Sequence, residues 1–290
     1  MNRGVIYAMS AYIFWGLHPI YWKMLKHIPS SGIVSHRIIW SLVFFSIIIT
    51  SRKNWGSLFN TIKNSKNKVL LFLPALLIGS NWATYIWAVN AGFVIETSLG
   101  YFISPLISVL LGVIFLKESL RRLQWFAMII ALSGVILMTA VYGQFPWISL
   151  FLATTWGLYG LLRKQSQVGP VDGLTIETLT LSVPAMIYLL MLPASSPAIA
   201  IPDLKTLFLL MGTGIVSGLP LIIYIKGARM IKLSLLGILQ YSYPSLILIL
   251  GYFVYGETMD QAKVLGFAFI WIAIIIYLID VNRTISKRKI

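Results

Sequence analysis

Long apolar runs alternate with short polar gaps along most of the chain. Each run has about the 20 residues that a helix needs to cross a bilayer core of about 30 Å. The pattern therefore predicts an all-α membrane protein with ten transmembrane helices. These are expected at residues 4–24, 32–51, 69–90, 95–116, 121–141, 146–163, 173–193, 205–226, 233–255 and 262–281.

The composition excludes a soluble globular domain. Hydrophobic residues make up 58% of the 290 positions and charged residues only 11%, whereas a soluble domain has roughly 25% charged residues. The chain has no cysteine, which excludes disulfides, thiolate metal sites and cysteine nucleophiles. The net charge of +15 comes from residues in short, separate gaps. Because a nucleic-acid binder needs a continuous basic face, nucleic acid is not an expected partner.

The gaps on alternate sides of the membrane differ in charge. Almost all Lys and Arg residues fall in gaps that share a side with the N-terminus, and the other gaps hold Lys23, Lys26, Lys205 and Lys263. Basic loops stay in the cytoplasm. We therefore expect a multi-pass protein of the cytoplasmic membrane whose N- and C-termini are both cytoplasmic.

The two halves of the chain share residues at matching spacings. At one constant offset the pairs are Trp15 and Trp156, Gly16 and Gly157, and Lys23 and Lys164. At a second offset, two residues shorter, the pairs are Tyr85 and Tyr224, Pro105 and Pro244, Gly112 and Gly251, and Glu118 and Glu257. We predict one five-helix repeat at 1–141, a second at 146–281 and a basic cytoplasmic tail at 282–290. With five spans each, the repeats enter the membrane from opposite sides, as in the inverted repeats of many secondary transporters.

Several stretches resemble the EamA-like exporters of the drug/metabolite transporter superfamily. They are Trp15-Gly16, the stretch 98–102 (SLGYF) before Pro105, and the stretch 115–118 (FLKE). The stretches 79–82 (GSNW) and 87–90 (WAVN), with Glu96, are similar to the RarD-type subgroup. The resemblance covers all ten spans. It implies a ten-helix basket with a central cavity, lined mainly by the first, third, fourth, sixth, eighth and ninth helices, and outward movement of small organic solutes.

Catalytic and cofactor-binding motifs are missing from the sequence. The histidines His18, His27 and His36 have none of the clustered ligands that a zinc site needs, and no P-loop is present. We therefore expect no enzyme, metal, cofactor or nucleotide-binding subunit. The expected partners are a small organic substrate and the lipid bilayer, for a secondary-active or facilitative transporter that acts by alternating access. A non-transporting receptor or sensor, or a channel, is the alternative, and the sequence leaves monomer and homodimer open.

Aromatic and amide side chains within the spans are the candidates for the substrate cavity. Ligand sites are mostly apolar with a few placed polar groups, and an amide buried in lipid needs a partner or a wet cavity. The alternative is that the aromatic residues form belts at the membrane interfaces. The candidates are Trp15, Asn81, Tyr85, Tyr101, Trp156, Tyr159, Tyr224, Gln240 and Tyr241.

A few ionisable residues lie inside the predicted spans, where charge is unfavourable and marks functional sites. His36 and Arg37 lie near one end of the second span, and Glu177 lies near the opposite end of the seventh. We predict a gate or proton-linked role for them. The structural alternative is that Arg37 reaches a helix end or the interface, and that Glu177 pairs with Arg163 or Lys164.

Two matched prolines and two matched lysines complete the set of candidates. Pro105 and Pro244 each remove a backbone donor from a helix, so they are predicted hinges or cavity-lining kinks. Lys23 and Lys164 follow their Trp-Gly pairs at opposite faces of the membrane. They are either interfacial anchors or symmetric gate cations that attract anionic or zwitterionic solutes.

Overall fold

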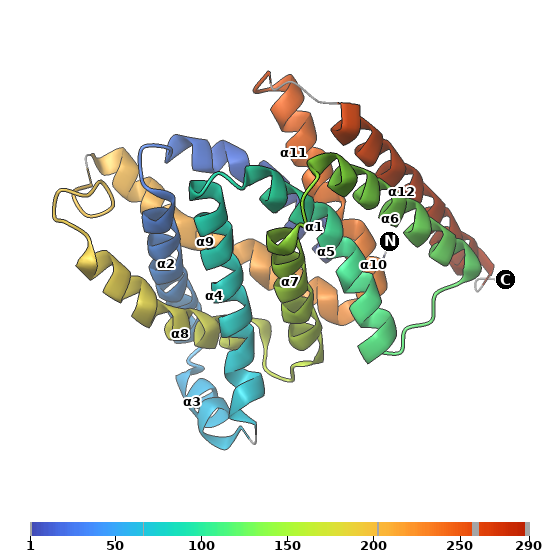
Figure 1. Cartoon of the computed structure of the whole chain (residues 1–290). Helices are drawn as coiled ribbons and strands as arrows, with labels where there is room; N and C mark the ends of the chain where they lie inside the picture. The colour runs from blue at the N-terminus through green and yellow to red at the C-terminus, as the bar shows by residue number, and fades with distance from the viewer. Residues whose placement is uncertain (1, 66, 202, 257–260, 288–290) are drawn as a thin grey trace.

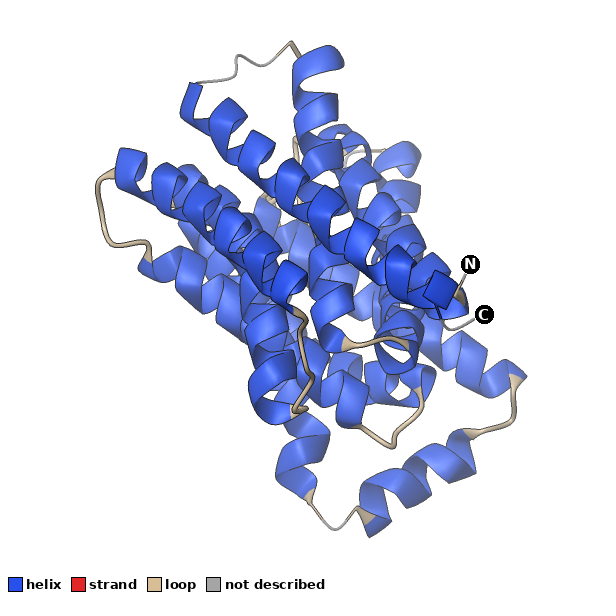
Figure 2. Ribbon diagram, turned by 90° about the vertical axis from the view of Figure 1, so that its right-hand side faces the viewer, coloured by secondary structure: helices blue, strands red, loops and turns tan. Residues whose placement is uncertain are grey.

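The computed structural model describes residues 2–65, 67–201, 203–256 and 261–287. These residues form helices and turns and no strand (Figure 2), so the predicted all-α class is confirmed for the described part of the chain. The helices are α1 (Arg3–Met24), α2 (Ser30–Ser51), α3 (Trp55–Asn64), α4 (Lys68–Asn90), α5 (Val94–Phe115), α6 (Arg122–Tyr142), α7 (Trp147–Gln165), α8 (Pro170–Met191), α9 (Leu204–Met230), α10 (Leu233–Gln240), α11 (Ser242–Phe253) and α12 (Gln261–Lys287).

Side chains just outside the helices satisfy several of the free backbone donors at the helix ends. Asn2 accepts a hydrogen bond from the Gly4 amide at the start of α1 (2.9 Å). Asp203 accepts one from the Thr206 amide at the start of α9 (2.7 Å). Asn, Asp, Ser and Thr are favoured at this position because their side chains replace the missing backbone acceptor. These caps fix where the helices begin.

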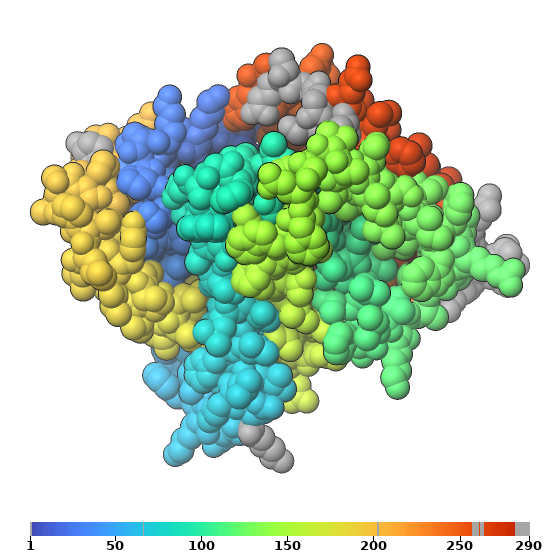
Figure 3. All heavy atoms as spheres, viewed as in Figure 1, coloured from blue at the N-terminus to red at the C-terminus, as the bar shows by residue number. Residues whose placement is uncertain are grey.

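The structure departs from the predicted spans in three places. A short helix, α3, occupies a predicted polar gap, and its apolar residues Trp55, Leu58 and Ile62 pack on the core; α3 projects at the bottom of Figure 3. The ninth span is broken into α10 and α11 at Tyr241. Helix α12 continues past the predicted end of its span, through part of the predicted tail, and residues 288–290 lie outside the described residues.

The break at Tyr241 lies three residues before Pro244. A proline inside a helix lacks the amide hydrogen and its ring crowds the carbonyl four residues earlier. For Pro244 that carbonyl belongs to Gln240, where α10 ends. Pro105, at the matched position, lies inside the continuous helix α5. The two prolines therefore have different local effects, and their use as hinges stays a prediction.

Eight of the described segments are long and apolar enough to span a bilayer, with α10 and α11 counted together. Helices α1 and α7 have 22 and 19 residues but are less apolar than the other long helices. Both carry hydroxyl and aromatic side chains that face neighbouring helices, and both are basic in the last turn. The fold is therefore that of a multi-pass membrane protein.

Helices from the two halves of the chain pack against each other throughout the bundle. Helix α1 packs on α9, α4 on α7, α2 on α8, and α5 on α7 and α10. Helices α6 and α12 lie side by side (Figure 1). They run antiparallel, since Arg121 at the start of α6 bonds to Asp280 near the end of α12 (2.6 Å). No five-helix half forms a separate globule.

One end of the bundle is rich in basic residues, and we call it the basic end. The first turn of α1 meets the end of α9 there, because Gly4 packs on Met230 and Ile231. Its basic residues are Arg3, Arg52, Lys53, Lys63, Lys68, Lys117, Arg121, Arg122, Arg163, Lys164, Lys226, Arg229 and Lys232. We call the other end, which carries the α1–α2, α4–α5 and α8–α9 connections, the opposite end.

Candidate substrate site and gates

Arg37 of α2 lies in a group of aromatic side chains, which we call the Arg37 cluster. Its guanidinium lies over the ring of Trp82 on α4, with Cζ 3.7 Å from the ring centroid. The ring centroid of Tyr85 is 6.3 Å from that of Tyr101 on α5, which is 5.1 Å from that of Tyr243 on α11. The Tyr101 hydroxyl interacts with those of Tyr85 and Tyr243. The cluster thus joins four helices from both halves of the chain.

The charge of Arg37 is not balanced by an acidic side chain among the described residues. Its Nε is buried and has no hydrogen-bond partner there. The Tyr85 and Tyr243 hydroxyls interact with it electrostatically, as does His18 of α1. A buried cation without a counter-ion is unfavourable. A charged ligand is one way to relieve that penalty.

A second aromatic group, the Trp15 cluster, lies where α1, α7 and α9 meet. Its members are Tyr12, Trp15, Trp156, Tyr159 and Tyr224. The ring centroid of Trp15 is 5.3 Å from that of Trp156 and 5.4 Å from that of Tyr224, and Trp156 and Tyr159 are 5.6 Å apart. The indole Nε1 of Trp156 is buried without an acceptor among the described residues. The cluster therefore holds one unused hydrogen-bond donor.

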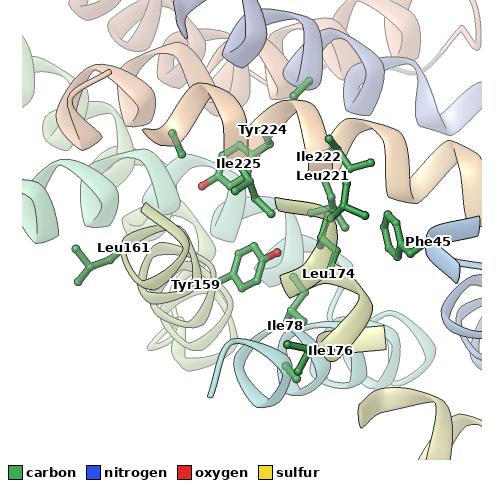
Figure 4. Close-up of a cluster of buried hydrophobic side chains, with 14 of the residues drawn as sticks. Phe45, Ile78, Tyr159, Leu161, Leu174, Ile176, Leu221, Ile222, Tyr224 and Ile225 are labelled. Carbon is green, nitrogen blue, oxygen red and sulfur yellow. The ribbon is translucent and has the colours of Figure 1, made fainter. Parts of the chain in front are cut away.

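Glu177 of α8 lies beside this cluster and is paired within the protein. Its Oε1 is 3.3 Å from the Nε of Arg163, and its Oε2 accepts a hydrogen bond from the Tyr159 hydroxyl (3.1 Å). Figure 4 shows that hydroxyl pointing toward α8. The guanidinium of Arg163 lies directly on Gly173, so a side chain at that glycine would displace it. The pairing of Glu177 with Arg163 is the structural alternative stated above, and a proton-linked role for Glu177 stays a prediction.

Helices α7 and α9 are fastened together at the basic end. Lys164 donates to the carbonyl of Ala228 (2.9 Å) and to that of Ile231. Arg229 of α9 donates to the carbonyls of Arg163 (3.2 Å) and Ser166 (2.7 Å), and also to that of Val168. We call these bonds the α7–α9 contact. They join α7 to α9 at the basic end of the bundle.

The matched residues at the opposite end make other contacts. Lys23 of α1 lies over the ring of Tyr255, with Nζ 3.8 Å from the centroid, and α1 and α4 are not in substantial contact within the described part of the chain. His36 bonds through Nε2 to the Ala198 carbonyl (2.8 Å) in the α8–α9 connection. That bond fastens the opposite end of α2 to a loop.

Three more of the predicted cavity residues bond to neighbouring helices. Asn81 donates from Nδ2 to the Leu152 carbonyl and to the Thr155 hydroxyl, both at 2.8 Å. Gln240 donates to Ser104 Oγ (3.0 Å). Tyr241 donates to the carbonyl of Phe102 (3.1 Å). These side chains join helices, and a role in a substrate cavity stays a prediction for them.

The structure brings Tyr85 and Tyr101 together with residues that sequence reasoning missed. Trp82 and Tyr243 belong to the Arg37 cluster but were not among the candidates. Trp82 shares a helix face with Tyr85 because residues three apart are neighbours on a helix, so the spacing could have indicated it. Tyr243 likewise lies three residues after the candidate Gln240 in the predicted ninth span, although its matched residue in the first half is Ser104.

A shallow hollow of about 580 Å³ lies along α2, away from both clusters. Its lining includes Leu42, Val43, Ser46 and Ile47 of that one helix. An aliphatic groove on a single helix is typical of a surface that packs against lipid. Polar groups of the kind that ligand sites contain come together in the Arg37 cluster.

Comparison with known proteins places the chain in a family. It matches the EamA-like transporter family over residues 2–140 and 146–279. It is 42% identical over 282 residues to a protein of Vibrio cholerae named "Uncharacterized transporter", covering 96% of this chain and 93% of that protein. It is 43% identical over 279 residues to "Uncharacterized transporter YojE" of Bacillus subtilis, with 95% and 93% covered.

A third relative and a solved structure agree with this. The chain is 39% identical over 280 residues to "Protein RarD" of Escherichia coli, covering 96% of this chain and 95% of that protein. A solved structure titled "Crystal structure of protein" has the same fold, with a TM-score of 0.74, 17% identity, and 97% and 98% of the two chains covered. The chain belongs to the EamA-like transporter family and resembles its RarD-type members. It is accordingly a transporter rather than an enzyme.

Proposed function

We propose that this member of the EamA-like transporter family is a ten-span carrier that exports small organic metabolites or drug-like solutes by alternating access. Its basic end and both termini lie in the cytoplasm. The concentration of Lys and Arg at one end supports this orientation, because basic loops stay on the cytoplasmic side. Helices α1 and α7 complete the ten spans.

Matched contacts support an inverted repeat. Gly16 of α1 packs on Leu246 of α11, and Gly157 of α7 packs on Ile107 of α5. Gly16 and Gly157 are related by the first offset, and Ile107 and Leu246 by the second. A two-fold axis in the membrane plane would exchange the two contacts. The same exchange relates the packing of α1 on α9 to that of α4 on α7.

A second pair of contacts obeys the same relation. Gln240 bonds to Ser104 (3.0 Å), and Tyr101 meets Tyr243 with ring centroids 5.1 Å apart. The second offset carries Tyr101 onto Gln240 and Ser104 onto Tyr243. The positions are conserved in space although the residue types differ. This favours repeats at 1–141 and 146–281.

The observation that carries the proposal is a difference between the two ends of the bundle. Lys164 and Arg229 fasten α7 to α9 at the basic end. Among the described residues, α1 and α4, the matched helices at the opposite end, are not in substantial contact. Two equivalent gates of which one is closed are what alternating access requires. On this basis we propose that the structure is the carrier in its outward-open state.

Transport by purified protein in liposomes tests the proposal. The vesicles are loaded with a mixed panel of neutral, cationic and anionic metabolites and drug-like solutes, and empty vesicles are the control. We expect at least one solute to leave faster than from the control, at a rate that saturates with its concentration. A carrier saturates because each turnover needs a conformational change.

Other results would contradict this function. Flux that rises linearly with concentration and carries current would indicate a channel. A solute that binds but never crosses would indicate a receptor. No movement of any solute in the panel would remove the support for a carrier.

A further inference from the structure

The Arg37 cluster contains a partly buried positive charge, with its Nε atom buried, and no acidic side chain of the described residues balances it. Arg163 is paired with Glu177 (3.3 Å) and Arg121 with Asp280 (2.6 Å). Arg37 has no corresponding carboxylate in the described residues, and its Nε has no acceptor there. A cation in this environment needs a counter-ion to be favourable. Arg37 is therefore poised to accept a negative group from a ligand.

The contact with Trp82 does not use up the hydrogen bonds of Arg37. A guanidinium has five N–H donors that all lie in its plane. Stacking on the indole, at 3.7 Å from Cζ to the ring centroid, covers one face and leaves the edge free. The in-plane donors match the two oxygens of a carboxylate. The geometry thus favours an acidic group at the edge of the guanidinium.

The surrounding groups suit the rest of such a ligand. Hydroxyls of Tyr85, Tyr101 and Tyr243 can donate to further oxygens, and their rings offer apolar faces. Tyr85 is 37% exposed, so the cluster is not sealed on that side. Aromatic side chains with a few placed polar groups form typical sites for small organic molecules.

We propose that the Arg37 cluster binds the carboxylate of an organic monoanion, and that aromatic or apolar carboxylates are the substrate class of the carrier. This inference rests on the proposed transport function. A single negative charge is expected because one arginine is unbalanced. A dianion would leave a net negative charge among tyrosines and a tryptophan.

Binding to the purified full-length protein in detergent tests the inference at neutral pH. The probes are phenylacetate, its uncharged analogue phenylacetamide, and the cation 2-phenylethylammonium. Quenching of tryptophan fluorescence and a rise in melting temperature are the two readouts. We expect phenylacetate to bind and the other two to bind at least about tenfold more weakly, since a charged hydrogen-bonded pair is lost.

Variants identify the residue that is responsible. We expect R37Q to weaken phenylacetate binding roughly tenfold to a hundredfold, and R37K to lose less because it keeps the charge but not the planar fork. R121Q is the matched control, because Arg121 at the start of α6 pairs with Asp280 of α12, and it should bind as the parent does. Size-exclusion chromatography of each variant checks that it is folded, and R37K provides the comparison if R37Q does not fold.

The same preparation in liposomes separates failure of this inference from failure of the carrier. Saturable export of a neutral or cationic solute, with no binding of phenylacetate, would overturn the inference and leave the carrier in place. Binding of phenylacetate that depends on Arg37, without any flux, would leave the site and overturn the carrier. Equal binding of phenylacetate and phenylacetamide would also overturn the inference.

Discussion

Helices α7, α8 and α9 form a connected group at the basic end, whereas α1, α2 and α4 do not form its equivalent at the opposite end. In the first group Lys164 bonds to the end of α9, and Glu177 neutralises Arg163. In the second group Lys23 lies over Tyr255 and Arg37 has no acidic partner among the described residues. The group whose helices are fastened together is also the one in which a buried arginine is paired with an acid.

Matched segments of the two halves can therefore have separate roles. The offset that pairs Lys23 with Lys164 also pairs His36 with Glu177 and Arg37 with Thr178. Glu177 is paired with Arg163, whereas His36 bonds to a loop carbonyl. Arg37 has no acidic partner among the described residues.

The largest expected effect comes from breaking the buried ion pair. We expect E177Q to lower the free energy of unfolding by about 3–5 kcal/mol, because Arg163 is then a buried charge without a partner. The matched variant H36Q removes one hydrogen bond to a loop carbonyl and should lower it by about 1 kcal/mol. Thermal and denaturant unfolding in detergent measure both.

The double variant R163M/E177L is the control for that comparison. Replacing both charges by apolar residues of similar volume is often neutral, so the double variant should recover most of the stability that E177Q loses. If E177Q and H36Q lowered the free energy of unfolding equally, the ion pair of Glu177 with Arg163 would not distinguish the two halves of the chain.

The next effect concerns the α7–α9 contact. We expect K164M to weaken it by about 1–2 kcal/mol, since charge-assisted bonds are lost at a partly exposed site. That would raise the population open at the basic end roughly fivefold to thirtyfold. Labelling of a single cysteine placed at Ser234, which is fully buried at the start of α10, reports the change. The parent has no cysteine to interfere.

K23M is the matched control for K164M. Among the described residues Lys23 makes no bond to α4, so K23M should not increase labelling at position 234. An increase as large as that of K164M would mean that both lysines act only as interfacial anchors.

Two matched glycines test the repeat itself. A Cβ at Gly16 would lie 2.7 Å from Leu246 Cβ, and one at Gly157 would lie 2.9 Å from Ile107 Cγ2. We expect G16A and G157A to lower the free energy of unfolding by a similar amount, about 1–3 kcal/mol each, because overpacking forces the neighbouring side chains to shift. Denaturant unfolding measures both, and a marked inequality would count against equivalent helix crossings.

The smallest effect concerns Asp203, which caps α9 at the opposite end. The Thr206 amide donates to it and holds the pKa of its carboxyl below the usual range. A lowered pKa means that its contribution is present above the usual pKa of an aspartate and is lost as the pH falls through the lowered value. We expect D203A to lower the melting temperature slightly at neutral pH and to have no effect at strongly acidic pH.

D203N separates the cap from the charge. Asparagine also caps helices well, so D203N should keep most of the melting temperature and lose its dependence on acid. A pH profile of melting that is unchanged in D203N would show that Asp203 is not the titrating group.

Much of the fold was predictable because a membrane constrains a sequence strongly. Backbone groups in lipid must bond within a helix, so length and hydropathy located α2 and α4 to α9 within a few residues. The break at Tyr241 was not predicted from Pro244, because the matched Pro105 lies inside a continuous helix. Helix α3 was missed because ten residues with three apolar contacts resemble an ordinary polar gap.

The candidate site was predicted only in part. Their position within the spans drew attention to Arg37 and Glu177, since charges in lipid are rare, and their predicted roles stay untested. Whether each had a partner depended on a residue elsewhere in the fold. For Glu177 the partner was foreseen as Arg163 or Lys164, which lie close in sequence, while Trp82 and Tyr243 come to Arg37 from other helices.

The apolar segments, the side on which the basic residues gather and the matched positions of the two halves could all be read from the order of residues. They follow from hydropathy, charge and spacing along the chain. Which charges are neutralised, and which pair of matched helices is in contact, became known from the packing of the helices. Those depend on distances between helices far apart in sequence, and a few ångströms there separate a satisfied ion pair from a charge that still needs a partner.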